Sequence, residues 1–402
     1  MRECGDVFVV VLVVAVTVLA AGGAALAQDA AERVLAVTVH EQQGLPRRGE
    51  LVCVEVGEAE GPQVRNDRGE PVPSQLVELG GKRTLWFAAD VDAGRSRTYS
   101  VVDGEPAAPA DPLRVEGQPA QEEVWITSAF WRIRLMPNSA NLDRFVLPGE
   151  PERVIFNKVG PVHWNPDVWS PNLNRPWRHT LAWKPAPGLR ESRGPLLYVL
   201  ERKGPLPEYD ELDVEVRYRF SATEPCVWME STTSILKDIT VRALRNGESV
   251  FAPELFSHAA CRDREGVMHS WKLEPHEEGA PPPPARPDDL WLAFYNPDNG
   301  LGIATIRLLV ENTGPGGGEP TLVGYDHMMI GVYDTYDYWS RALVFPAGKV
   351  EDVQNVVPVP AGNVYREKEA WLVFRAEGGE PFAEVDAAAQ RLLHPLKVHV
   401  QR

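Results

Sequence analysis

The sequence predicts an all-β protein in which a small N-terminal β-domain precedes a larger domain built from antiparallel sheets. Apolar and polar residues alternate in short runs along most of the 402 residues, which is the pattern of half-buried strands. Pro and Gly separate these runs, as turns between strands require. A single segment near the C-terminus has helical periodicity instead, so we expect one short C-terminal helix.

The first residues have the pattern of an export signal. Arg2 precedes an apolar run over residues 7–20, and the small residues at Ala25 and Ala27 form a cleavage pattern before Gln28. We therefore expect a signal peptide over residues 1–27 and a secreted or periplasmic mature protein. Stable membrane insertion is not expected after cleavage, and a retained membrane anchor is the alternative.

The remaining chain divides at a stretch that is rich in Pro, Ala and Glu. Residues 104–123 have no periodicity and are interpreted as a linker. Residues 28–103 then form the small β-sandwich domain. Residues 124–402 form the large domain, which is too long for a simple immunoglobulin-type sandwich and suits a larger double-sheet structure.

Two segments show the two periodicities clearly. Residues 213–220, DVEVRYRF, alternate strictly, so one face of a half-buried strand carries Val214, Val216, Tyr218 and Phe220. Residues 381–396, PFAEVDAAAQRLLHPL, place Phe382, Val385, Ala389 and Leu392 on one helical stripe between two prolines. The first segment predicts a strand of the large domain and the second predicts the helix.

Charge and cysteine usage exclude several function classes. The formal net charge of −16 argues against a nucleic-acid partner, because counterion release requires a cationic surface. No His, Cys, Asp or Glu spacing resembles a transition-metal site, and no phosphate or dinucleotide motif occurs, so neither a metal nor a cofactor is expected. Cys226 and Cys261 could pair after export, but the sequence leaves this open.

Residues 66–102 carry a recognisable pattern. It consists of Gly69, Val72, Pro73, Gln75, Gly94, Thr98 and Tyr99. This pattern resembles the small β-domain that precedes the large β-supersandwich in α-mannosidase-type glycosidases and in several polysaccharide lyases. Residues 126–135, ITSAFWRIRL, are similar to the opening strand of that supersandwich, and residues 194–235 are similar to its following meander.

The resemblance implies a galactose-mutarotase-like β-supersandwich for the large domain. It does not imply one activity, because this architecture hosts lyases, epimerases and non-catalytic glycosidase modules. In the α-mannosidases the catalytic residues lie on an α/β domain upstream of this region. The resemblance therefore carries none of their catalytic residues to this chain.

Residues 324–345, GYDHMMIGVYDTYDYWSRALVF, combine strand alternation with many polar aromatic side chains. Alternation divides the stretch into a core face and a polar-aromatic face, namely Met328, Ile330 and Val332 against Tyr325, His327, Met329, Gly331 and Tyr333. We interpret the second face as an open concave surface with Tyr336, Trp339 and Arg341 at its rim. The alternative is a core face whose Tyr and His are hydrogen-bonded internally.

Residues 163–183 form a second aromatic cluster. They lack strand alternation and are interpreted as a long functional loop, which supplies Trp164, Trp169, Trp177, Arg175, Arg178 and His179. Tryptophan rings stack on the apolar faces of sugars, and arginine binds carboxylates or sulfates in bidentate fashion. A loop whose aromatic rings fill a gap between two sheets is the alternative.

Together the two clusters supply the groups for β-elimination on a uronic-acid polymer, which needs a cation for the carboxylate, a base and an acid. The candidate catalytic residues are His327, Tyr325, Tyr333, Arg178 and His179. The candidate substrate-binding residues are Arg175, Trp164, Trp169, Trp177, Tyr336, Trp339 and Arg341. The expected partner is a polysaccharide or oligosaccharide.

Other function classes stay open at this point. A non-catalytic carbohydrate-binding or structural module would use the same aromatic residues without chemistry. A sugar epimerase would need a histidine acid and a carboxylate base, for which the sequence offers His258, His179 or His327 with Glu254 or Asp326. A glycosidase needs two opposed carboxylates, and no motif selects them, so a glycosidase accessory protein is the form of this alternative that we retain.

Overall fold

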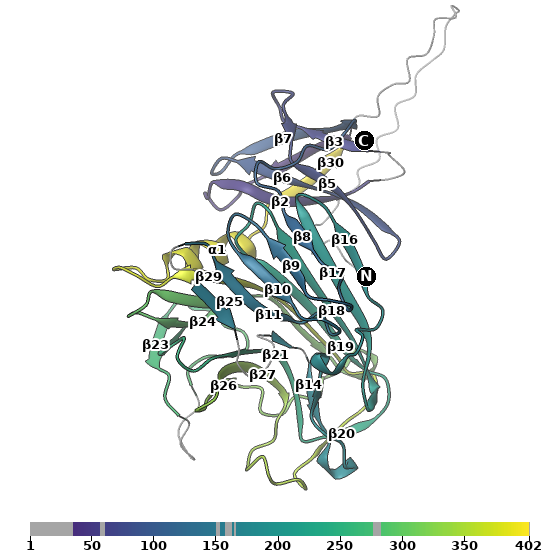
Figure 1. Ribbon diagram of the computed structural model, residues 1–402, viewed down its shortest axis with the longest axis vertical. Helices are drawn as coiled ribbons and strands as arrows, with labels where there is room; N and C mark the ends of the chain where they lie inside the picture. The colour runs from purple at the N-terminus through teal and green to yellow at the C-terminus, as the bar shows by residue number, and fades with distance from the viewer. Residues whose placement is uncertain are drawn as a thin grey trace, which may run out of the picture. The chain divides into compact units, whose positions relative to one another are not determined.

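The computed structural model describes residues 35–56, 61–149, 153–156, 163–164, 166–275 and 283–401 (Figure 1). The expected signal peptide lies outside these residues. The chain divides into two compact units. The first combines Met1–Pro112 with Gly194–Leu196 and His394–Arg402, and the second combines Leu113–Arg193 with Leu197–Leu393. Within the described ranges, no helix is long and apolar enough to cross a membrane.

The first unit is a β-sandwich of two antiparallel sheets. The larger sheet has the order β30 (Lys397–Gln401), β1 (Leu35–His40), β7 (Ser96–Asp103), β3 (Pro62–Arg65) and β4 (Pro71–Val72). The smaller sheet has the order β2 (Arg47–Glu55), β6 (Lys82–Val91) and β5 (Ser74–Leu79). One apolar core takes side chains from both sheets, including Val37, Val52, Phe87, Tyr99 and Val398. The pairing of β30 with β1 brings the last strand of the chain into this unit, which the sequence pattern did not indicate.

The residues that carry the family resemblance have structural roles in this unit. The Tyr99 hydroxyl donates to the Asp90 carbonyl at 2.9 Å and accepts from the Asp90 N–H at 2.8 Å. Gln75 Oε1 accepts from the Leu196 N–H at 3.1 Å. This second bond ties residues 194–196 to the first unit, although the neighbouring strands belong to the second.

A buried carboxylate organises two turns of the first unit. Glu41 is 4% exposed and accepts backbone N–H groups of Gln43, Gly44 and Gly94, each at 2.8 Å. Arg47 adds an ion pair at 3.3 Å. Gly94 has φ of +63°, a conformation that glycine adopts without steric cost. Burial by itself raises the pKa of Glu41, but these hydrogen bonds outweigh it and lower the pKa to about 2.

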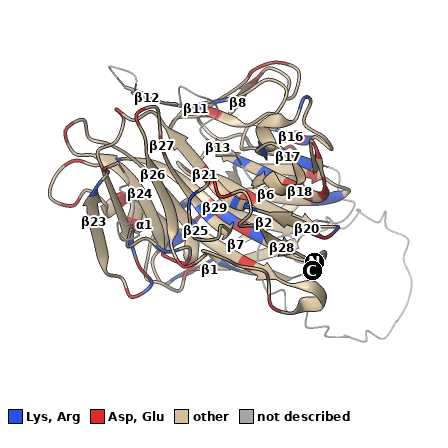
Figure 2. Cartoon of the chain, turned by 90° about the horizontal axis from the view of Figure 1, so that it is seen from below, with Lys and Arg blue, Asp and Glu red and all other residues tan. Residues whose placement is uncertain are grey.

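The second unit is built from three large antiparallel sheets. We call the nine-stranded one sheet F: β16 (Arg190–Arg193), β17 (Leu197–Leu206), β18 (Tyr209–Ser221), β19 (Val227–Ile235), β29 (Val364–Arg375), β25 (Leu301–Thr313), β24 (Trp291–Asn296), β22 (His258–Arg262) and β23 (Met268–Lys272). Sheet D contains β12 (Arg153–Phe156), β11 (Leu142–Leu147), β10 (Arg132–Leu135), β9 (Val124–Thr127) and β8 (Arg114–Glu116). Acidic and basic residues are mixed along β17, β18 and β29 of sheet F (Figure 2).

Sheet E positions the candidate site. Its order is β15 (Arg178–His179), β14 (Asp167–Trp169), β21 (Ala243–Phe251), β27 (Asp337–Val344) and β26 (Met328–Val332), and β13 (His163–Trp164) pairs with β21. The short strands β20 (Ile239–Val241) and β28 (Val357–Val359) form a separate pair. One core cluster takes side chains from sheets D, E and F, for example Ile133, Trp339 and Phe294.

The predicted alternation and the predicted helix are both confirmed. Val214, Val216, Tyr218 and Phe220 of β18 are fully buried in this core. The helix α1 spans Ala383–Leu393 and buries Val385, Ala388 and Ala389 in a second cluster against sheet F. The all-β supersandwich with one C-terminal helix is therefore the fold that the sequence predicted.

The predicted loop over residues 163–183 and the predicted linker over residues 104–123 both contain regular structure. Residues 163–183 hold the strands β13, β14 and β15 and the 3₁₀ turns Pro171–Leu173 and Thr180–Ala182. Each strand is two or three residues long, too short for alternation to show in the sequence. Residues 104–123 contain β8, which pairs with β9 and so belongs to the second unit.

We expect Glu41→Gln to destabilise the first unit by about 3 kcal/mol, because it replaces the charged acceptor of three backbone N–H groups and the more buried of the ion-pair partners of Arg47. The lowered pKa of Glu41 has a matching pH signature. Its stabilisation is complete above the ordinary pKa of 4.5 and is lost as the pH falls through about 2. Urea denaturation followed by circular dichroism from pH 6 to pH 2 measures both effects.

The control is Asp92→Asn, which removes an exposed ion pair with Arg48 and should change stability little. Equal stability of Glu41→Gln and the unsubstituted protein at pH 6 would show that Glu41 does not organise these turns.

Candidate functional site

An open groove of about 650 Å³ lies in the second unit between three chain segments. Its walls are residues 136–139, residues 177–184 and the turn at Pro207 and Glu208. Trp177, Arg178 and His179, three of the candidate site residues, line this groove. We call it the Trp177 groove. It joins an aromatic ring, a cation and an imidazole within one concave surface.

The Trp177 ring and the loop that carries it are held in place by neighbouring side chains. It stacks on Trp169 of β14 with ring centroids 4.8 Å apart and an interplanar angle of 16°. The buried Tyr209 hydroxyl accepts from the Ser170 N–H at 3.0 Å and donates to the Pro176 carbonyl at 2.7 Å. Because these bonds hold both ends of the intervening loop, the two tryptophans form a rigid wall.

Arg175 has a structural partner close to the groove. Its guanidinium donates to both oxygens of Glu211, at 2.8 and 2.7 Å, and lies 5.3 Å from the centroid of the Tyr209 ring. Both bonds come from the single nitrogen Nη1, so Glu211 already engages the guanidinium that was predicted to bind a sugar carboxylate. Arg175 therefore holds the loop that carries Trp177.

Arg178 and His179 lie side by side on the edge strand β15. The Arg178 side chain is 30% exposed and forms an ion pair with the half-exposed Glu208 across the groove. His179 pairs with Asp167 across the strands. Burial lowers the pKa of His179, the cations Arg245 and Arg178 lower it further, and Asp167 opposes them. The imidazole is therefore neutral at neutral pH and can accept a proton.

A charged cluster lies next to His179 on sheet E. Arg245 of β21 forms ion pairs with Asp167 and with Glu248, the latter at 2.9 Å. All three side chains are at most 11% exposed. Burial raises the pKa of Glu248, and Asp167 adds to this although Arg245 opposes it.

Arg245 connects the Trp177 groove to the tyrosines of the second aromatic stretch. Its guanidinium carbon lies 5.2 Å from the Trp177 ring centroid and 5.6 Å from that of Tyr338. Tyr338 packs over Gly331 of the neighbouring strand, where any Cβ would meet the ring at 2.0 Å. Gly331 belongs to the face that was interpreted as an open concave surface, but the Tyr338 ring fills the space above it.

The structure does not bring Arg178 and His179 together with His327 and Tyr325. The first pair lies on β15 and the second precedes β26, at opposite edges of sheet E. Four strand spacings of about 4.8 Å separate these edges by roughly 19 Å. Tyr325 instead accepts long hydrogen bonds from Asn312 and Arg341, each at 3.4 Å.

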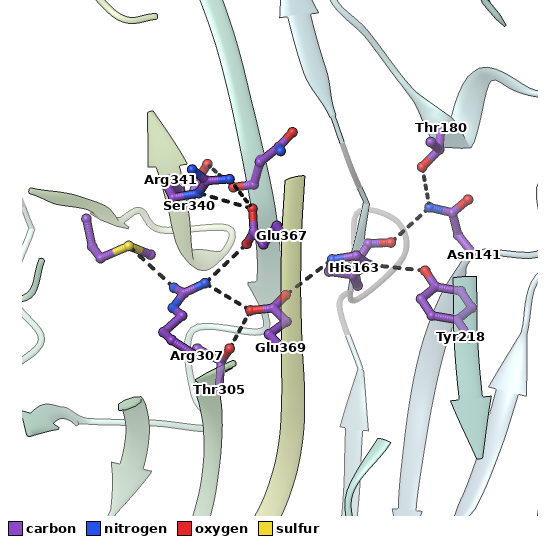
Figure 3. A network of polar contacts seen from close by, with 12 residues as sticks. Asn141, His163, Thr180, Tyr218, Thr305, Arg307, Ser340, Arg341, Glu367 and Glu369 are labelled. Atoms are coloured by element: carbon purple, nitrogen blue, oxygen red, sulfur yellow. Dashed lines mark hydrogen bonds and ion pairs between the residues drawn. The ribbon is translucent and has the colours of Figure 1, made fainter. Parts of the chain in front are cut away.

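Arg341 belongs to a polar network between sheets E and F (Figure 3). Its guanidinium pairs with Glu367 at 2.6 Å, and Arg307 contacts Glu367 at 3.2 Å and Glu369 at 3.0 Å. Burial raises the pKa of Glu369. Glu369 faces His163 at 3.9 Å, and burial keeps the pKa of that imidazole low, so it is uncharged. Every one of these side chains is at most 4% exposed.

The network also reaches the wall of the Trp177 groove. Asn141 donates to the His163 carbonyl and to Thr180 Oγ1, each at 2.9 Å (Figure 3). Thr180 opens the 3₁₀ turn whose next two residues line the groove. The position of this wall is thus tied to the charges between the sheets.

Two further candidate residues have different surroundings. Trp339 is fully buried, with its ring 4.9 Å from Phe251 and 4.8 Å from Phe294, so the indole is part of the core and is closed to a ligand at the surface. Trp164 lies on β13, but its side chain is outside the described part of the chain.

Sequence reasoning missed Asp167, Arg245 and Glu248. The available signal was a polar interruption, RNGE at residues 245–248, within an otherwise apolar strand. This interruption is a β-bulge, because the register with β27 shifts between Asn246 and Ser249. Bulges re-aim side chains, and this one allows Arg245 and Glu248 to meet.

Among the described residues, no group of three or more His, Cys, Asp and Glu side chains could hold a metal ion.

No protein-family model matches the sequence, and no curated protein matches it. Solved structures do. A protein of glycosyl hydrolase family 38 and an α-mannosidase, both from Enterococcus faecalis, each match with a TM-score of 0.57 at 12% sequence identity. The matches cover 92% of this chain but 47% and 46% of those proteins, so the chain spans about half their length. At this identity the likeness shows the fold, and it confirms the resemblance to α-mannosidase-type glycosidases.

We expect Arg341→Met to lower the stability of the second unit by about 3–5 kcal/mol, because it leaves the buried Glu367 carboxylate without its closest partner. Arg366→Met on β29 is the matched control, since it removes only an exposed pair with Glu311. The free energy of unfolding in urea measures the difference. A stable Arg341→Met variant that no longer binds sugar would instead support the substrate-binding role predicted from the sequence.

Proposed function

We propose that the protein binds a polysaccharide or oligosaccharide in the Trp177 groove. The observation that carries this proposal is a rigid aromatic wall, Trp177 stacked on Trp169, beside Arg178 in an open concave surface. Such a wall suits the apolar face of a sugar ring, and the neighbouring polar groups suit its hydroxyls. The fold shared with a family 38 glycosyl hydrolase supports a carbohydrate ligand.

The groove favours a sugar that carries a carboxylate. Arg178 and the exposed Lys184 line it, against a single acidic lining residue, Glu208. The Arg178–Glu208 pair is partly exposed, so its loss costs little free energy. A uronic-acid carboxylate can therefore replace Glu208 on the guanidinium. This local excess of cations contrasts with the overall charge of −16.

Cleavage of the bound glycan by β-elimination is the second candidate, and the neutral His179 imidazole beside Arg178 favours it. In this step a base takes the proton α to the carboxylate, and its electron pair forms a carbon–carbon double bond. The glycosidic C–O bond breaks, and the leaving oxygen takes a proton. Arg178 would neutralise the carboxylate and His179 would act as the base.

A tyrosine base has less support than His179. The candidate tyrosines Tyr325 and Tyr333 flank β26, which lies at the opposite edge of sheet E from Arg178 on β15. The export-signal pattern of residues 1–27 supports action outside the cytoplasm, where polysaccharides of this kind occur.

We expect Trp177→Ala to weaken binding of an acidic polysaccharide roughly tenfold or more, because the ring is the central stacking surface. Affinity electrophoresis in gels containing polygalacturonate, alginate or chondroitin measures the retardation. Trp228→Ala is the control, since this half-buried ring lies between Arg219 and Lys368 on sheet F and should leave binding unchanged. Equal retardation of the unsubstituted protein in gels with and without every polymer would contradict the proposal.

If the protein cleaves the glycan, His179→Ala should abolish formation of the unsaturated product while binding persists. The unsubstituted protein should lose activity as the pH falls through the lowered pKa of His179, because the protonated imidazole cannot accept a proton. Ultraviolet absorbance of the product follows the reaction, with His327→Ala as the active control. Binding without product from any of the three polymers identifies a non-catalytic module.

A further inference from the structure

We propose that the glycan site extends beyond the Trp177 groove to a second stacking platform formed by Tyr333 and Tyr336. This inference rests on the proposed function, since it assigns the continuation of the same bound chain. The ligand would be an oligosaccharide of several sugars that runs from Trp177 past Arg245 and Tyr338 to this platform.

The platform lies at the tip of the hairpin between β26 and β27. The Tyr333 N–H donates to the Tyr336 carbonyl at 3.0 Å and closes the turn. The ring centroids of Tyr333 and Tyr336 are 5.1 Å apart, and Tyr333 stacks on Tyr338 at 6.1 Å with an interplanar angle of 6°. Tyr333 is nonetheless 50% exposed. A supported aromatic ring therefore presents surface to solvent at a hairpin tip, which is an arrangement suited to binding.

A series of side-chain contacts links the tyrosine platform to the Trp177 groove, and the glycan bound in the groove is therefore the ligand that we assign to the platform. The Arg245 guanidinium carbon is 5.2 Å from the Trp177 ring and 5.6 Å from the Tyr338 ring, and Tyr338 is in turn stacked with Tyr333. Each ring or cation in this series thus contacts the next. Arg245 and Tyr338 are themselves at most 11% exposed, so they set the separation between two more exposed surfaces, Trp177 and Tyr333, which a ligand of several sugars can span.

The middle of the series is fixed in position. Arg245 is held by Asp167 and Glu248, and Tyr338 is packed over Gly331. The path is therefore formed before a ligand binds, which lowers the entropy cost of binding. Because Arg245 already has carboxylate partners, the acidic sugar belongs at the Arg178 end. The tyrosine end presents rings and hydroxyls beside the exposed Asp334, and it suits the face of a sugar ring rather than its carboxylate.

The experiment compares ligand length. Isothermal titration calorimetry with galacturonate disaccharide and hexasaccharide should show about tenfold tighter binding of the hexasaccharide by the unsubstituted protein. Tyr333→Ala, alone and with Tyr336→Ala, should remove this gain and leave disaccharide affinity unchanged. Trp177→Ala should weaken both ligands. Phe130→Ala removes another exposed ring and serves as the control, and thermal melts by circular dichroism verify that each variant is folded.

Each contrary outcome has a distinct meaning. If Trp177→Ala weakens binding but Tyr333→Ala leaves the hexasaccharide gain intact, the platform is overturned and the proposed function stands. A hexasaccharide that binds no tighter than the disaccharide also overturns the platform. If Trp177→Ala changes neither affinity, the proposed function itself fails. If Tyr333→Ala converts a dimer to a monomer in sedimentation velocity without changing affinity, the platform is a contact between two copies of this chain.

Discussion

The second unit depends on the burial of four charged side chains between its two facing sheets. Arg307, Arg341, Glu367 and Glu369 lose their hydration there and are compensated by one another. An unpaired charge at this depth would cost several kcal/mol. Sheets E and F must therefore meet in the register that pairs them. The neutral imidazole of His163 adds a hydrogen bond with the Tyr218 hydroxyl at 3.1 Å without a further buried charge.

The buried polar network between sheets E and F also fixes the wall of the Trp177 groove. Asn141 joins the His163 backbone to Thr180 in the groove wall, and Tyr209 holds the loop before Trp177. An aromatic surface for sugars benefits from such support, because a ring that is already ordered loses little entropy when a ligand binds. The stacking of Trp169 on Trp177 and the pair of Arg175 with Glu211 serve the same purpose. Arg175 and Trp169, which the sequence suggested as ligand contacts, thus support the wall of the groove.

The two aromatic clusters found in the sequence differ in how well their roles could be predicted. Trp177, Arg178 and His179 line the groove, and their residue types alone indicated a polar aromatic surface. Alternation also separated Met328 correctly as a core residue. It could not show that Trp339 and Arg341 are covered by sheet F, because a two-residue period tells which side chains share a face and not what packs against that face.

The sequence by itself determined the all-β class, the alternation of β18, the position of α1 and the motif whose Gly94 and Tyr99 hold turns of the first unit. These features depend on periodicity and on local backbone geometry, which neighbouring residues encode. The tertiary structure alone decided that Arg245 links Trp177 to Tyr338 and that His327 lies far from His179. Strand order places β14, β21 and β27 side by side, and pairing between distant segments leaves no periodic signal in the chain.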